Sequence, residues 1–174
     1  MTAIEAQLII SVATIVTTIS GGGVIAAVVA HKLSSARAER EFERRKLEEL
    51  FVAVHRYCTK LFAANIVWPR VMRGEIDYNQ GLDIFIKNHS KKDENHETAI
   101  MIINIYFPKL RQAFDGILHR RDRINNIKSD FKATYLRGNN CGSFERPFLD
   151  ELKAIDADEK KFMDELFQIS RSLK

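Results

Sequence analysis

The chain has few of the residues that cross-link a fold or interrupt its helices. Among its 174 residues are 2 cysteines, 3 prolines, 8 glycines and 1 tryptophan. Because Cys58 and Cys141 lie far apart and form no Cys-x-x-Cys pair, the sequence favours free thiols in a reducing compartment. A disulfide between these two cysteines is the alternative that their spacing leaves open.

Neither sign of charge dominates the sequence. The 27 basic and 23 acidic residues leave a net charge of +4 and an isoelectric point near 9.1. Proteins that coat nucleic acid usually concentrate far more positive charge than this. The composition therefore argues against a protein built mainly to cover nucleic acid.

Recognisable catalytic and metal-binding motifs are missing. The five histidines belong to no His-Glu-x-x-His motif and to no carboxylate spacing typical of a metal site. The sequence has no phosphate-binding loop and no Gly-x-Ser-x-Gly element. Seven residues separate Arg111 from His119, so the Arg-x4–6-His signature of HEPN-type ribonucleases is not matched. We therefore expect no enzymatic activity, no metal and no cofactor.

What the sequence does contain is one long apolar segment. Residues 8–30 carry no charge over 23 positions, and roughly 20 apolar helical residues cross a bilayer core of about 30 Å. We expect this segment to be a transmembrane helix. A cleaved signal peptide is the alternative, but Glu5 precedes the run, no Lys or Arg does, and the run exceeds the roughly 7 to 15 residues of a signal-peptide core.

The flanks of this segment predict its orientation. Residues 31–46 hold six basic side chains, whereas the residues before the segment hold none. Since basic flanks stay in the cytoplasm, we expect a bacterial inner-membrane protein with its N-terminus outside and its C-terminal domain in the cytoplasm. The same basic residues suit contact with anionic membrane lipid.

The rest of the chain is predicted to be helical. Residues 31–46, rich in Ala, Glu and Arg, form a charged stem that continues the membrane helix, and residues 47–174 form a cytosolic helical bundle. The expected fold class is therefore all-α. Two seams with the alternating three- and four-residue spacing of packed helices support the bundle. They are Leu47, Phe51, Val54, Cys58, Leu61, Asn65 and Trp68, and then Phe148, Leu152, Ile155, Glu159, Phe162, Leu166, Ile169 and Leu173.

Local signals predict where the first bundle helices begin and end. Pro69 and Gly74 are expected to close the helix that carries the first seam. Asp77 and Gln80 have the spacing of a capping box, which predicts a short helix over about 78–88.

Further along the chain, Ser90 and Asp93 are expected to cap a third helix, which Pro108 kinks or restarts. Residues 138–143 read as a loop because they combine glycine, asparagine and serine. Pro147 suits the first turn of the final helix.

Segment 8–30 also contains the clearest candidate for a functional surface. Small residues at four-residue spacing let helices approach closely in lipid, and three consecutive glycines at mid-span suit close packing or a hinge. The alternative is that small residues are simply common in single spans. The candidates for self-association or for lining a pore are Ser11, Thr14, Thr18, Gly21, Gly22, Gly23, Ala26 and Ala30.

A basic run in the second half of the chain is the candidate for binding an anionic ligand. Arginine side chains suit phosphate and carboxylate groups, so RNA, a nucleotide or a lipid headgroup fits such a surface. The alternative is a solvated helix face whose charges pair with Asp115 and Asp122. The candidate residues are Arg111, His119, Arg120, Arg121, Arg123 and Lys128.

The plan of the chain resembles small bacterial single-span membrane proteins that act as accessories or effectors in antiphage and CRISPR-associated defence. The resemblance rests on the span at 8–30, the stem at 31–46 and the helical remainder. It implies oligomers that disturb the membrane when infection is sensed. We therefore expect a non-enzymatic, homo-oligomeric inner-membrane protein that forms or gates a pore in antiphage defence. The alternative is a membrane-tethered binding module that recognises an anionic ligand (RNA, nucleotide) or a protein partner.

Overall fold

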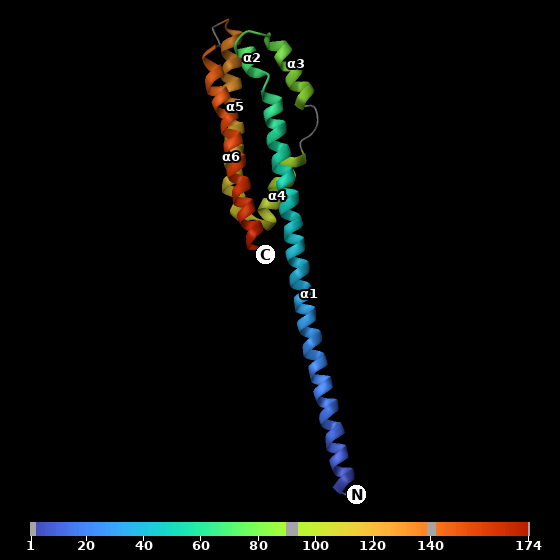
Figure 1. Ribbon diagram of the computed structural model, residues 1–174. Helices are drawn as coiled ribbons and strands as arrows, with labels where there is room; N and C mark the ends of the chain where they lie inside the picture. The colour runs from blue at the N-terminus through green and yellow to red at the C-terminus, as the bar shows by residue number, and fades with distance from the viewer. Residues whose placement is uncertain (1–2, 90–93, 139–141, 174) are drawn as a thin grey trace. The chain divides into compact units, whose positions relative to one another are not determined.

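The computed structural model describes the backbone of residues 3–89, 94–138 and 142–173, and the side chains of residues 30–88, 94–138 and 142–173. All regular structure in these ranges is helical, and they contain no strand, so the predicted all-α class is confirmed. The chain divides after Glu43 into two compact units, residues 1–43 and 44–174. The helices and 3-10 turns are α1 (Ala3–Asn65), α2 (Trp68–Met72), α3 (Tyr78–His89), α4 (Glu94–Tyr106), η1 (Pro108–Leu110), α5 (Arg111–Leu136), η2 (Gly142–Phe144) and α6 (Glu145–Ser172) (Figure 1).

The first unit is helical from Ala3 onward. Between residues 30 and 43 nearly every side chain is exposed, including Leu33 and Phe42. The predicted stem is therefore helical without a core of its own, as its content of strong helix formers allows. Among the side chains that the structure describes, no helix is both long enough and apolar enough to cross a membrane. The predicted span at 8–30 lies, apart from Ala30, outside those side chains.

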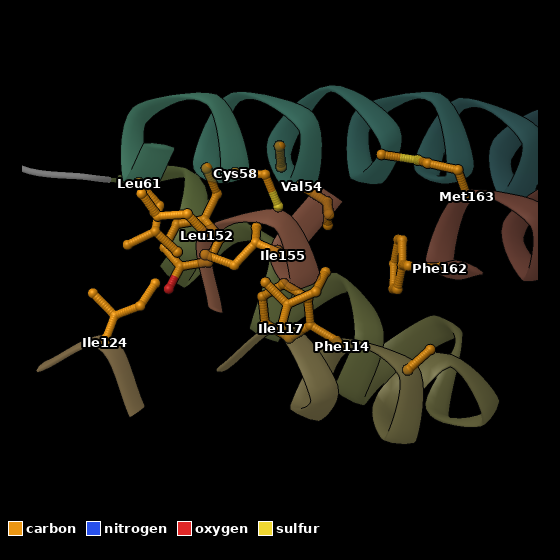
Figure 2. Close-up of a cluster of buried hydrophobic side chains, with 14 of the residues drawn as sticks. Val54, Cys58, Leu61, Phe114, Ile117, Ile124, Leu152, Ile155, Phe162 and Met163 are labelled. Carbon is orange, nitrogen blue, oxygen red and sulfur yellow. The ribbon is translucent and has the colours of Figure 1, made fainter. Parts of the chain in front are cut away.

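The second unit is a helical bundle in which α5 and α6 pack antiparallel. The ring centroids of Phe114 and Phe162 lie 6.0 Å apart, and so do those of Phe131 and Phe144. The residue number therefore rises from Phe114 to Phe131 along α5 as that of the partner falls from Phe162 in α6 to Phe144 in the turn η2 just before α6. Both helices turn an apolar face inward, and the side chains between them are buried (Figure 2).

The part of α1 that belongs to this unit closes the core from another side. Tyr57 packs its ring 6.1 Å from that of Phe114, and His96 of α4 lies 5.2 Å from Tyr57. Figure 2 shows Val54, Cys58 and Leu61 of α1 above Leu152 and Ile155 of α6. The largest fully buried side chains come from α1, α4, α5, α6 and the turn before α5: Phe114, Phe131, Phe148, Phe162, Leu50, Ile102, Ile103, Leu110, Ile117, Ile124, Val54 and Cys58.

Both predicted seams face this core. All residues of the first seam are buried except Phe51, which is partly buried. In the second seam Glu159, Ile169 and Leu173 are partly buried and the others are buried. The heptad spacing therefore describes packing within one chain.

The capping-box prediction is confirmed. The backbone N–H of Asp77 donates to Gln80 Oε1 at 3.1 Å, and the N–H of Gln80 donates to Asp77 Oδ1 at 2.9 Å. This reciprocal pair satisfies two backbone donors at the start of α3. The helix begins at Tyr78, as the spacing predicts.

The prediction that Pro69 closes the first bundle helix is wrong. Helix α1 ends at Asn65, and Pro69 lies in the first turn of the separate helix α2. A proline lacks the N–H that has no helical partner in a first turn, so it starts a helix more easily than it continues one. Gly74 does end α2: at φ 75° it lets Glu75 N–H reach Arg70 O and its own N–H reach Val71 O.

The predictions at the two later prolines are confirmed, whereas the predicted loop 138–143 ends earlier than expected, because Gly142 and Ser143 belong to the turn η2. Pro108 opens the short turn η1 between α4 and α5, and Pro147 lies in the first turn of α6. Ser90 and Asp93 lie outside the described residues, as do residues 139–141 of the predicted loop.

Two helical glycines give a test of this packing with opposite expected signs. A methyl group at Gly81 would overlap the Val71 side chain, whereas one at Gly116 would meet Asp158 Oδ2 at an ordinary 3.8 Å. We expect Gly81→Ala to destabilise the protein by about 1–3 kcal/mol, because α2 and α3 must separate. Gly116→Ala should stabilise it by about 0.5–1 kcal/mol, because alanine favours the helix. Denaturant unfolding measures both, and equal effects from the two variants would contradict the close α2–α3 contact.

Candidate functional site

Helices α5 and α6 share a network of ion pairs built around the basic run. Arg120 lies with Nε 2.9 Å from Asp158 Oδ2 and with Nη1 3.2 Å from Glu151 Oε2. Arg123 Nη2 lies 2.7 Å from Glu151 Oε1. The Glu151 side chain is only 8% exposed, so its carboxylate is largely removed from water and is neutralised by two guanidinium groups.

The remaining arginines of the run also have carboxylate partners. Arg111 Nε lies 2.9 Å from Asp115 Oδ1, and Arg121 Nη2 lies 2.7 Å from Asp122 Oδ1. These are the two acidic partners that the sequence offers as the alternative to ligand binding. His119 is exposed on the same helix.

An open cleft of about 610 Å³ lies beside this network, between α5 and α6. Its charged lining residues are Arg123, Arg146, Asp130, Asp150 and Glu151. Three carboxylates thus face two guanidinium groups. This cleft has no excess of positive charge with which to select an anion.

Lys128 differs from the arginines because its partners are aromatic rings. Its Nζ lies 4.6 Å from the centre of the Phe85 ring and 6.0 Å from that of Trp68. At this position the faces of the two rings attract the charged ammonium group of Lys128. Burial nevertheless disfavours the charged form and lowers the pKa of Lys128 to about 8. Lys128 therefore joins α5 to α2 and α3 and is not an open docking point.

A second cleft, between α1 and α6, contains a cysteine, a histidine and two carboxylates. Its volume is about 520 Å³, and Phe62, Leu152 and Ile155 contribute to its apolar walls. His55 Nδ1 lies 2.9 Å from Glu159 Oε1, and the same carboxylate accepts a hydrogen bond from the Cys58 thiol.

This arrangement holds the Cys58 thiol in its neutral form. Burial raises the pKa of Cys58, and the negative charge of Glu159 raises it further. A nucleophilic cysteine needs the opposite environment, one that lowers its pKa and favours the thiolate. Cys58 is a free thiol, as the sequence favours, whereas Cys141 lies outside the described residues and its state stays a prediction.

The described part of the chain contains no group of three or more His, Cys, Asp or Glu side chains that could hold a metal ion. The membrane-segment candidates Ser11, Thr14, Thr18, Gly21, Gly22, Gly23 and Ala26 lie outside the described side chains, and Ala30 is exposed. The arrangement within segment 8–30 therefore stays a prediction from the sequence.

Sequence reasoning missed Glu151 and Asp158 as partners of the basic run. They are seven residues apart, a spacing that places both on one side of a helix, next to the second seam. That spacing was the available signal. Which helix the pair would face is a question of tertiary packing.

No protein family, curated protein or solved structure matches the chain.

Removing Glu151 tests whether the network is structural. Glu151→Ala leaves Arg123 and one edge of Arg120 without a carboxylate, so we expect a loss of about 1–3 kcal/mol in the free energy of unfolding. Asp115→Ala is the matched control, because its pair with Arg111 is exposed and should contribute about 0.5 kcal/mol or less. If denaturant unfolding showed no loss of stability for Glu151→Ala, the ion pairs of Arg120 and Arg123 with Glu151 would not stabilise the fold.

The lowered pKa of Lys128 predicts a pH-dependent stability. Between pH 8 and 10.5 the folded protein has released the Lys128 proton while the unfolded chain still holds it, so stability rises with pH in that window. Across this window we expect the free energy of unfolding of the wild type to rise by about 1–3 kcal/mol relative to that of Lys128→Met. The rise is smaller than the pKa shift alone would give, because the aromatic rings and the remaining contact with solvent stabilise the ammonium group.

The exposed residue Lys132 on the same helix supplies the control variant Lys132→Met. Thermal unfolding at several pH values from 7 to 10.5 measures all three proteins. A wild-type curve parallel to that of Lys128→Met would contradict the buried position of the ammonium group.

Proposed function

We propose that the protein is a single-span inner-membrane protein that self-associates through segment 8–30 and thereby forms or gates a pore. The observation that carries the proposal is the stripe Thr14, Thr18, Gly22, Ala26 and Ala30 beside three consecutive glycines. Small residues favour close helix contact in lipid, where apolar burial gives little driving force. A helix that served only as an anchor would have no need of glycines that weaken it.

The bundle, which follows the basic stem in the chain, would lie on the cytoplasmic side. This orientation follows from the six basic residues of 31–46 and the absence of basic residues before the span. The resemblance to single-span defence proteins supplies the biological setting, in which assembly is coupled to sensing an infection. The heptad seams do not contribute to self-association, because they are buried in the chain's own core.

The membrane-tethered binding module receives less support. To recognise an anionic ligand it would need an accessible cationic surface, but the four candidate arginines pair with Asp115, Asp122, Glu151 or Asp158. An enzyme receives less still, since the one described thiol beside a histidine is held in its neutral form.

Substituting one face of the span tests the proposal. We expect Gly22→Ile to reduce the mass of the detergent-solubilised assembly and to abolish membrane permeabilisation, because the added side chain separates neighbouring helices. Val24→Phe is the control: on an ideal helix it lies about 200° from Gly22, so equal bulk there should be tolerated.

A second experiment separates a pore from a tether. Replacing residues 8–30 with an unrelated poly-leucine span preserves insertion but removes the small-residue stripe. We expect function and permeabilisation to be lost. Retained function with this span, or a monomer in detergent for the wild type, would contradict the proposed role.

A further inference from the structure

Lys128 occupies a position of α5 at which the spacing of the helix calls for an apolar residue. Ile124, Lys128, Phe131 and Tyr135 follow one another at steps of four, three and four residues, which places them along one face of the helix. Ile124 and Phe131 are fully buried, whereas Lys128 is partly buried. The Lys128 amine is therefore sheltered from bulk water but not sealed from a small reagent.

Aromatic rings of α2 and α3 face this amine, and no counter-ion does. Lys128 Nζ lies 4.6 Å from the centre of the Phe85 ring and 6.0 Å from that of Trp68, and the centroids of these two rings are 5.9 Å apart. In the part of the chain that the structure describes, no carboxylate pairs with Lys128. The arginines of the same helix differ, since each of the four candidates has such a partner.

These surroundings change the chemistry of the amine. Burial lowers the pKa of Lys128 to about 8, so roughly a tenth of this amine is neutral at pH 7, against less than about 0.1% for a lysine in water. The neutral amine has the free electron pair that attacks a carbonyl carbon, and lysines in apolar surroundings act as nucleophiles for this reason. A site that disfavours charge is a poor place to hold an anion, but it suits covalent chemistry of the neutral amine.

The same surroundings favour one class of product. A carbamate formed from carbon dioxide would replace one unpaired charge with another, whereas an amide carries no charge and removes the cost of keeping an ion beside the rings. An amide also adds a carbonyl acceptor two bonds from Nζ. The Trp68 side chain is buried, and its indole N–H has no hydrogen-bond partner among the described residues. A new acceptor next to this ring suits such a donor.

We propose that Lys128 is an acylation site, at which the amine takes a small acyl group from an activated ester of the thioester class. The electron pair of Nζ attacks the carbonyl carbon, so that a C–N bond forms and the C–S bond breaks. The sulfur leaves with the electron pair of that bond, and the proton released from Nζ converts it to a thiol. The neutral amide then strengthens the contact of α5 with α2 and α3. This inference does not rest on the proposed function, because it concerns only residues of the bundle.

Site-resolved acetylation of the full-length chain in detergent tests the reactivity. The probe is the S-acetyl thioester of N-acetylcysteamine at neutral pH, and mass spectrometry of peptides measures the rate at each lysine. We expect Lys128 to react about tenfold faster than the exposed Lys132, because a larger share of its amine is neutral. In concentrated urea the two rates should become equal. A rate at Lys128 equal to or below that at Lys132 in the folded chain would overturn the proposal, and so would a difference that persists in urea.

The effect of the amide on the fold is measured separately. Biosynthetic replacement Lys128→Nε-acetyl-lysine should raise the midpoint of thermal unfolding at pH 7 by a few degrees, because the buried group no longer carries a charge. The same replacement at Lys132 is the control and should leave the midpoint unchanged, since that side chain is exposed. A midpoint at or below that of the wild type for the replacement at Lys128 would overturn the stabilising role of the amide.

Discussion

The antiparallel packing of α6 against α5 is the contact on which the rest of the bundle depends. It places Phe162 beside Phe114 and Phe144 beside Phe131, which fixes the register of the two longest helices of the second unit. The same register brings Glu151 and Asp158 to Arg120 and Arg123. Apolar burial supplies most of the stabilisation in such a core, while the partly buried ion pairs specify the alignment and would cost stability if broken.

This register also decides what the basic run can do. Arginine binds phosphate through the same donors with which it binds carboxylate, so an arginine already held by a carboxylate is less available to a ligand. On α5 the pairing includes residues of α6 as well as neighbours on the same helix. The basic run is therefore better explained as part of the packing of two helices than as an anion-binding surface.

The α1 helix supplies residues to both units, and its character changes along its length. From residue 30 to 43 its side chains are nearly all exposed, and from Leu47 onward one face is buried in the bundle. The larger apolar residues left exposed are spread over several elements of the second unit, among them Val52 of α1, Met101 of α4, Leu136 of α5 and Phe167 of α6. Apolar residues scattered over a surface are normal and by themselves mark no place of contact.

The sequence by itself determined the all-α class, the capping box at Asp77 and Gln80, the restart at Pro108 and the buried face of both seams. These features depend on hydrophobic spacing and on groups only three or four residues apart, which local chemistry governs. Only the tertiary structure decided that α1 ends at Asn65, that Arg120 and Arg123 face Glu151, and that Lys128 lies over Phe85. Those outcomes join residues that are distant in sequence, and spacing along one helix cannot predict which helix will lie opposite it.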